Sequence, residues 1–130
     1  MLDDSGEQAV PHIWSEIETR TAELGFDMPS DMRTGALLKA LAASKPHGRL
    51  LELGTGTGLA TACLLAGMDS ASQLVTVDIE AQVQAVARGV LGSDSRISFE
   101  LADGREFIRT QQHQSFDLVF ADAWAGKYAV

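Results

Sequence analysis

The sequence has one cysteine, no long apolar run and no basic residues at its start, and each shortage excludes a class of protein. Cys63 has no partner for a disulfide within the chain, and its apolar neighbours predict a small buried thiol. No apolar run approaches the roughly 18 residues that a membrane-spanning helix needs, and the N-terminus lacks the basic start of a signal peptide. We therefore expect a cytoplasmic protein with no membrane partner.

Basic residues are also outnumbered over the whole chain. There are 10 Lys and Arg against 18 Asp and Glu, a net charge of −8, so most of the surface should repel a phosphate backbone. Nucleic acid is therefore not expected as a partner. The three histidines fall in different segments and form no metal-ligand pattern. With 130 residues, 45% of them hydrophobic, the chain is long enough to bury the core of one domain.

The most informative segment that is present reads Glu-Leu-Gly-Thr-Gly-Thr-Gly at residues 52–58, directly after two leucines. Three glycines at alternate positions let the backbone turn sharply at the end of a strand and approach a ligand, and the following helix presents free N–H groups there. Glu52 would oppose the charge of a pyrophosphate, whereas it would attract a ligand that carries an ammonium and a sulfonium group. S-adenosylmethionine is such a ligand.

A second acid follows at the spacing of one βαβ unit. The β-branched run that starts at Leu74 ends in Asp78, 20 residues beyond Gly58, and a carboxylate at the tip of the second parallel strand can accept both hydroxyls of a ribose. Dinucleotide-binding folds use an acid at this point too, so Asp78 alone does not separate the two ligand classes. Their fingerprint also requires Gly or Ala where this sequence has Leu59. A nicotinamide-dependent oxidoreductase is therefore less favoured.

Apolar residues recur alternately at the period of a helix and at that of a strand, which is typical of an α/β protein. An N-terminal helix should end near Gly25, and a second helix after Pro29 should carry Leu37, Leu38 and Leu41 on one face. A further helix should run from the glycine segment to about Gly67. The next should bury a face made of Val83, Val86, Ala87, Val90 and Leu91, and another should contain Phe107 and Ile108.

The expected strands are 49–53, 73–78, 96–101 and 117–121, and they imply a parallel sheet in the order 3-2-1-4. The carboxyl ends of parallel strands meet at one edge of the sheet, which is where such folds bind ligands. Glu52, Asp78, Asp103 and Asp122 each end a strand or follow one. Each acid alone could equally be a helix N-cap or a solvated loop residue, but four together indicate a site.

Several of these segments resemble the motifs of one enzyme family. Residues 49–60 with Asp78, residues 97–104, and residues 115–124 with Tyr128 resemble class I, Rossmann-like methyltransferases that use S-adenosylmethionine, and most closely the catechol and caffeoyl-coenzyme A O-methyltransferase type. The resemblance runs from about residue 28 to residue 128. It implies a doubly wound parallel sheet, with a helical lead-in over 1–48 and an incomplete S-adenosylmethionine-binding core over 49–130, in one structural domain overall.

The resemblance also implies roles for individual residues. Trp124 would pack against the adenosyl group, while Arg105 could contact the adenine edge or be simply solvated. The methionine end of the cofactor would lie against Glu52, Gly54, Thr55, Gly56, Thr57 and Gly58, the ribose against Asp78, and the adenine against Ile79, Asp103 and Gly104.

For catalysis, the resemblance implies a metal and a base. Asp122 matches the position of the family's first ligand to Mg²⁺ or another divalent cation, which would lower the pKa of the acceptor hydroxyl. The family's other ligands come from an Asp-Asn pair after a fifth strand, and this sequence has no Asn. Ala125 replaces the family's lysine after the Trp, which leaves Lys127 as the candidate base.

Strands five to seven of the resembled fold have no counterpart in the sequence, which favours a fragment of a longer product over a half-domain. The open edge of the fourth strand would then be a site of homo-oligomerisation. The favoured function is transfer of a methyl group from S-adenosylmethionine to a hydroxyl of a small-molecule acceptor. A non-catalytic cofactor-binding module or assembly partner is the alternative, and an enzyme of the aminopropyl-transfer type would share the fold.

Overall fold

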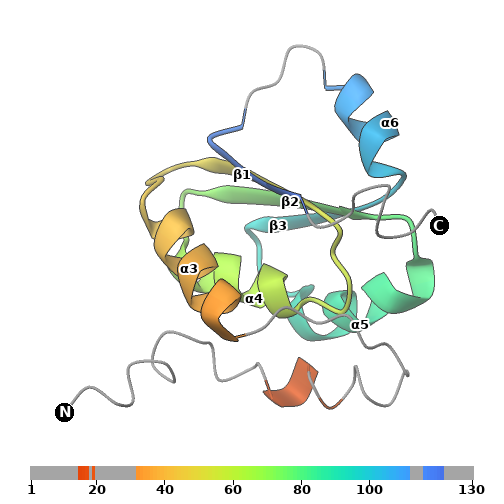
Figure 1. Cartoon of the computed structure of the whole chain (residues 1–130), viewed down its shortest axis with the longest axis horizontal. Coiled ribbons are helices and arrows are strands. Elements are labelled where there is room, and N and C mark those ends of the chain that lie inside the picture. Colours follow the sequence, from red (N-terminus) through yellow and green to blue (C-terminus); the bar gives the residue numbers. More distant parts are fainter. Residues whose placement is uncertain (1–14, 18, 20–31, 112–115, 122–130) are drawn as a thin grey trace.

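The computed structural model describes residues 15–17, 19, 32–111 and 116–121 of the chain, and the first four of these residues are helical. In chain order, the remaining elements are α3 (Met32–Ala43), β1 (Arg49–Leu53), α4 (Leu59–Gly67), β2 (Gln73–Asp78), α5 (Ala81–Leu91), β3 (Ile97–Leu101), α6 (Gly104–Arg109) and β4 (Leu118–Ala121) (Figure 1). Each strand lies within one residue of the bounds expected from the sequence. The strictly alternating order confirms the α/β class.

The four strands form one parallel sheet in the order β3-β2-β1-β4. In the register of the two central strands, Leu51 pairs with Val75 and Glu52 with Thr76, while Leu53 pairs with Ala121 on the other side. The predicted order 3-2-1-4 is therefore confirmed. Because all four strands are parallel, their carboxyl ends lie along the same edge of the sheet.

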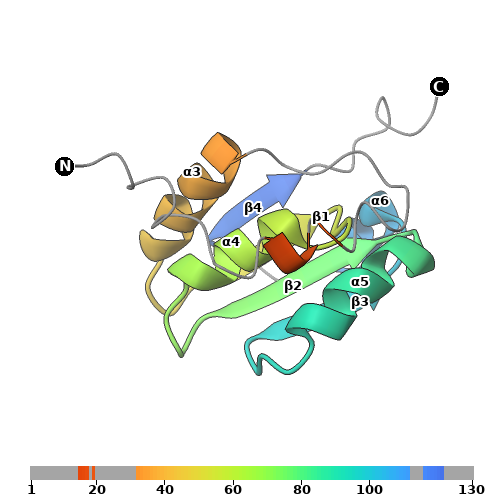
Figure 2. The same ribbon diagram turned by 90° about the horizontal axis from the view of Figure 1, so that it is seen from below.

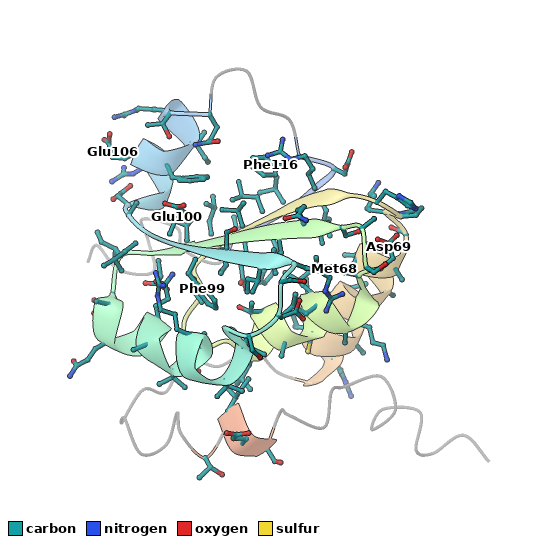
Figure 3. All side chains as sticks on the ribbon, turned by 180° about the vertical axis from the view of Figure 1, so that it is seen from behind. Met68, Asp69, Phe99, Glu100, Glu106 and Phe116 are labelled. Atoms are coloured by element: carbon teal, nitrogen blue, oxygen red, sulfur yellow. The ribbon has the colours of Figure 1, made fainter. Side chains whose placement is uncertain are left out.

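Helices α3, α4 and α5 cover one face of the sheet, and α6 lies on the other (Figures 1 and 2). Successive residues of a strand point to opposite faces, so Leu50 packs with the three helices whereas Leu51 and Leu53 pack toward α6. Figure 3 shows Phe99 on the side of α5 and Glu106 on the side of α6. The larger core lies under the three helices and includes the described Ile17.

The packing of α3 corrects the face expected from its leucines. Leu38 is buried, but Leu37 and Leu41 are 58% and 37% exposed, and Ala42 takes their place in the core. The reason is the close approach of α4: a Cβ added to Gly67 would lie 2.0 Å from the carbonyl oxygen of Lys39. A helix that approaches so closely packs through small residues, and the broader leucine face turns outward.

The faces of the other two long helices agree with the sequence. In α5, Ala87 and Leu91 are buried, and the three valines of the expected face are half-buried. In α4, Cys63 is fully buried, as predicted. Burial, with a smaller contribution from the charge of Glu52, raises the pKa of the Cys63 thiol to about 11. Among the described helices, none is long and apolar enough to cross a membrane.

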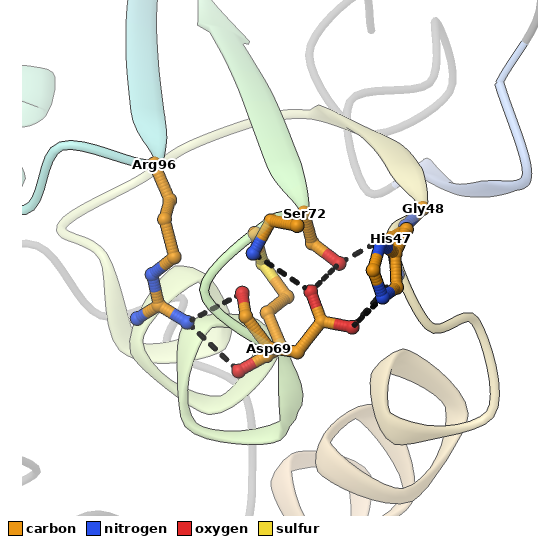
Figure 4. Close-up of polar contacts among 7 residues, drawn as sticks. His47, Gly48, Asp69, Ser72 and Arg96 are labelled. Atoms are coloured by element: carbon orange, nitrogen blue, oxygen red, sulfur yellow. Dashed lines mark hydrogen bonds and ion pairs between the residues drawn. The ribbon is translucent and has the colours of Figure 1, made fainter.

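A polar cluster around Asp69 joins loops at the amino-terminal edge of the sheet, opposite the glycine segment (Figure 4). The Asp69 carboxylate accepts hydrogen bonds from the backbone N–H of His47 (2.7 Å) and from the hydroxyl of Ser72 (2.9 Å). Arg96 donates to the carbonyl of Met68 (2.9 Å) and pairs with Asp94 (2.7 Å). These contacts hold the entries to β1, β2 and β3 together.

Candidate cofactor site

The glycine segment forms a turn between β1 and α4 at the carboxyl edge of the sheet. Gly54, Gly56 and Gly58 all have positive φ values, of 104°, 56° and 102°. Side chains strongly disfavour these conformations, so the alternation of glycines in the sequence is a requirement of the backbone. At Gly58 there is a second reason, because an added Cβ would lie 2.8 Å from the Cβ of Ala87 in α5. We call residues 54–58 the glycine turn.

Backbone hydrogen bonds hold the glycine turn against the end of β2. The N–H groups of Gly54 and Thr55 both donate to the carbonyl oxygen of Val77, at 2.7 and 3.1 Å. The N–H of Gly56 donates to Oδ2 of Asp78 at 2.8 Å. The turn therefore lies over the tip of the second strand, as the βαβ spacing in the sequence predicts.

Asp78 is 5% exposed and joins the turn to the start of α5. While Oδ2 accepts from the turn, Oδ1 accepts from the N–H of Glu80 at 2.8 Å. An ionised carboxylate offers about four acceptor positions, so these two bonds leave capacity for a ribose hydroxyl. Beside it, Ile79 is 59% exposed at the strand tip. The ribose and adenine contacts predicted for Asp78 and Ile79 remain predictions.

Glu52 is fully buried on the side of the sheet that faces α4. Its Oε1 accepts hydrogen bonds from the hydroxyls of Thr61 in α4 (2.5 Å) and Thr76 in β2 (2.7 Å). These threonine contacts are not foreseen by the sequence analysis, which assigns Glu52 to the methionine end of the cofactor. That assignment is still a prediction.

Another buried polar residue, Gln84 in α5, is absent from the set predicted from the sequence. Its side-chain amide donates to the hydroxyl of Thr55 (3.0 Å) and to the carbonyl of Glu100 (3.1 Å). The sequence does contain a sign that Gln84 is buried, because Gln84, Ala87 and Leu91 are spaced as one buried face of a helix. A glutamine on such a face needs partners, and here one of them is the glycine turn.

Asp103 and Gly104 begin α6 at the carboxyl end of β3. The Asp103 carboxylate caps this helix, because Oδ1 accepts from the N–H groups of Arg105 (2.8 Å) and Glu106 (3.4 Å). The Arg105 side chain is 78% exposed and lies 3.8 Å from the same oxygen. A Cβ added to Gly104 would make only ordinary contacts with Leu53. Helix capping thus accounts for Asp103 without a ligand, and its adenine contact remains a prediction.

The remaining predicted residues, Asp122, Trp124 and Lys127, lie outside the described residues, so their roles in metal binding, adenosyl packing and catalysis are untested. Within the part of the chain that is described, no group of three or more His, Cys, Asp and Glu side chains could hold a metal ion. The glycine turn, Asp78 and Ile79 therefore define the candidate site.

A family model described as a methyltransferase domain matches residues 51–128, which contain the last three residues of β1, the glycine turn and the whole of β2, β3 and β4. The chain belongs to this methyltransferase domain family. The resemblance noted in the sequence, to class I methyltransferases that use S-adenosylmethionine, is thereby confirmed.

Curated relatives of this methyltransferase domain are longer than the chain. A provisionally assigned O-methyltransferase of Mycolicibacterium smegmatis is 36% identical in an alignment 97 residues long, and the match covers 68% of this chain and 44% of the relative. One from Mycobacterium leprae is 32% identical in an alignment 115 residues long, and the match covers 85% of this chain and 51% of the relative. The chain thus spans about half the length of the curated relatives it matches.

Solved structures share the fold at low sequence identity. The O-methyltransferase TomG of Streptomyces achromogenes, determined with S-adenosylmethionine, matches with a TM-score of 0.77 at 23% identity, over 87% of this chain and 54% of TomG. An O-methyltransferase of Bacillus cereus, determined with S-adenosylhomocysteine, matches with a TM-score of 0.75 at 20% identity, over 87% and 55%. These likenesses confirm the Rossmann-like fold of the methyltransferase domain.

Proposed function

We propose that the chain binds S-adenosylmethionine and supplies the cofactor-binding part of an enzyme that methylates a hydroxyl of a small molecule. The observation that carries the proposal is the glycine turn, which the Asp78 carboxylate and the Val77 carbonyl hold over the tip of β2. Membership of the methyltransferase domain family and the cofactors present in TomG and the Bacillus cereus enzyme support it.

The described residues fit such a cofactor. Three left-handed glycines bring bare backbone to the carboxyl edge of the sheet, where a bulky ligand can approach without meeting side chains. Asp78 retains acceptor capacity for ribose hydroxyls. The exposed Ile79 provides an apolar surface for an adenine at the strand tip. We place the nucleoside at Asp78 and Ile79 and the methionine end at the glycine turn.

When bound, the cofactor supplies an electrophilic methyl group on its sulfonium, and attack by the acceptor oxygen forms the C–O bond as the C–S bond breaks. The contribution of the described residues is to fix one reactant in place, because holding two reactants in line removes much of the entropic barrier. No step is assigned to a metal, since Asp122 lies outside the described residues. The acceptor proton must pass to a base, for which Lys127 is the candidate.

The domain organisation is part of the proposal. We keep the division into a helical lead-in over 1–48 and a cofactor-binding core over 49–130, within one structural domain. Leu38 and Ala42 of α3 share a buried cluster with Leu50 and Leu64, which supports a continuous core across that boundary. The cytoplasmic location likewise stays a prediction.

Titration calorimetry on the 130-residue chain tests the proposal. We expect S-adenosylhomocysteine to bind and a nicotinamide dinucleotide not to bind, because Glu52 and the glycine spacing disfavour a pyrophosphate. Failure to bind S-adenosylhomocysteine, or preference for the dinucleotide, would show that the proposed ligand is wrong.

A methyl-transfer assay then separates the enzyme from the alternative, a cofactor-binding module without catalysis. Ala125 stands where the resembled enzymes have a lysine, which favours the module for this chain alone. We expect cofactor binding with negligible transfer to catechol-type acceptors, with or without magnesium. Robust methylation by the 130-residue chain would contradict this expectation and place the catalytic machinery within it.

A further inference from the structure

Gln84 is 1% exposed, and both N–H groups and the oxygen of its side-chain amide make hydrogen bonds within the protein. The two N–H groups of Nε2 serve the hydroxyl of Thr55 and the carbonyl of Glu100, and Oε1 accepts from Nε of Arg88 at 3.3 Å. Arg88 in turn lies over the ring of Phe99, 5.0 Å from its centroid. The orientation of the amide is therefore fixed from both sides, with one N–H toward the glycine turn and the other toward β3.

The hydrogen bonds that continue from Gln84 run in one direction. Thr76 donates to Oε1 of Glu52, and a hydroxyl has a single proton, so in the 2.8 Å contact between the two threonine hydroxyls Thr55 donates and Thr76 accepts. Thr55 is then free to accept from Gln84. The hydrogen bonds therefore run from the amide of Gln84 in α5 to the hydroxyls of Thr55 and Thr76, and end at the carboxylate of Glu52 in β1. In a buried setting the bonds of such a chain strengthen one another.

We propose that Gln84 is a positioning residue for S-adenosylmethionine, which acts by holding Thr55 and with it the glycine turn in the conformation that binds the cofactor. The inference rests on the proposed function. Thr55 lies between Gly54 and Gly56, whose backbones have the widest conformational freedom, so its buried side chain can anchor the turn in addition to the backbone hydrogen bonds. A turn that is already ordered loses less entropy when a ligand binds.

The same face of α5 supports the other end of the turn. Ala87, one helical turn after Gln84, is the residue that a Cβ at Gly58 would meet at 2.8 Å. The glycine turn is thus in contact with α5 at Thr55 and at Gly58. Helix α5 follows β2 and lies behind the turn. Because it holds the turn in place, α5 is part of the cofactor site.

Two substitutions at Gln84 test the proposal, with a matched control. Gln84→Glu keeps the size of the side chain but removes both N–H donors, and an ionised carboxylate there could only accept, so that Thr55 would have to turn its proton away from Thr76. Gln84→Met removes the donors without adding charge. The control is Gln82→Glu, the same change at an exposed position of the same helix.

The first measurement needs no ligand. Amide hydrogen exchange should become about tenfold faster at residues 54–58 in both Gln84 variants, because one hydrogen bond fewer holds the turn, while exchange within α3 stays unchanged. The second measurement is calorimetry with S-adenosylhomocysteine, whose Kd should rise about tenfold in both variants. Gln82→Glu should leave both readouts within about twofold of the wild type, since an exposed amide holds nothing in place.

Each outcome decides a different point. If the wild-type chain does not bind S-adenosylhomocysteine, the proposed function fails, and hydrogen exchange alone still decides whether Gln84 holds the turn. If the wild type binds and the Gln84 variants bind equally well, or if exchange at the turn is unchanged, the positioning role is wrong. If circular dichroism shows that both Gln84 variants have lost the folded state, Gln84 is a requirement of the fold and the positioning role is again wrong.

Discussion

Asp78 connects two backbone segments, because one carboxylate oxygen accepts from Gly56 and the other from Glu80. Asp78→Ala should remove both the proposed ribose partner and an anchor of the glycine turn. Hydrogen bonds to a charged group contribute roughly 1.5 to 3 kcal/mol, so affinity for S-adenosylhomocysteine should fall about tenfold or more in calorimetry. Asp117→Ala is the control, since Asp117 also accepts a backbone N–H, that of Arg49, at the opposite edge of the sheet. Equal affinity in the Asp78 variant would remove this residue from the site.

Two glycines at the carboxyl edge should respond differently to the same substitution. Gly58→Ala must place a Cβ in a left-handed conformation and 2.8 Å from Ala87, so it should destabilise the fold by roughly 1 to 3 kcal/mol. Gly104→Ala meets Leu53 only at ordinary contact distances, and we expect a change within about 0.5 kcal/mol. Urea denaturation measures both. Similar effects at the two positions would contradict the steric explanation.

The sequence predicts the glycine turn and Asp78 because the backbone of the turn requires glycines and the βαβ unit fixes the spacing from the turn to Asp78. The left-handed positions admit little but glycine, and a βαβ unit brings the tip of its second strand back to the first. The partners of Glu52 could not be predicted in this way. Thr61 and Thr76 meet it only because α4 packs onto β1 and β2, a tertiary contact with no local pattern.

At the scale of elements, the loop that leads into β3 carries an ion pair with a defined pH dependence. The guanidinium of Arg96 donates to Asp94 and holds the pKa of that carboxyl below its ordinary value of 3.8. A pKa that is lower in the folded chain than in the unfolded one contributes stability above pH 3.8, and this contribution disappears as the pH falls through the lowered pKa.

Asp94→Asn should therefore reduce stability at pH 7 and make the loss of stability on acidification less steep. Urea denaturation at pH 7 and at pH 3 gives the comparison. In an Arg96→Met background the same substitution should have a smaller effect, because the guanidinium is gone and only the backbone N–H of residue 96 still lowers the pKa of Asp94. An acid profile of Asp94→Asn equal to that of the wild type would show that the pair does not act in this way.

Element boundaries were easier to predict than element faces. The bounds follow from the change of apolar period and from flanking glycines, both of which are local. Which face of α3 is buried depends on how closely α4 approaches, and the contact of Gly67 with the Lys39 carbonyl turns Leu37 and Leu41 outward. Gln84 is not predicted from the sequence, because apolar periodicity does not identify a polar residue on a buried face.

At the scale of the whole molecule, β4 is an edge strand within the described residues, paired only with β1. Val119 pairs with Leu51 and is 51% exposed on the face that carries α6. An apolar edge of this kind is a template for pairing with another chain, so we predict that the 130-residue chain self-associates. Light scattering at high concentration measures this directly.

Val119→Lys should shift the chain toward monomer, because a charge on an edge strand opposes pairing with a second strand. Leu37→Lys is the matched control, since Leu37 is similarly exposed but lies on α3. A wild-type chain that remains monomeric, or equal self-association in the two variants, would exclude the β4 edge as the interface.

Because Cys63 is buried, the rate at which its thiol reacts reports how often the core opens. Since the sequence has no other cysteine, a thiol reagent can modify the chain at one position, and only the thiolate reacts. The thiol lies fully inside the core between α4 and the sheet, with a pKa raised to about 11, so labelling must wait for an opening of the helical layer. The rate of modification therefore measures how often that layer opens, without any probe having to be introduced. A ligand held at the glycine turn, which leads directly into α4, should slow the reaction.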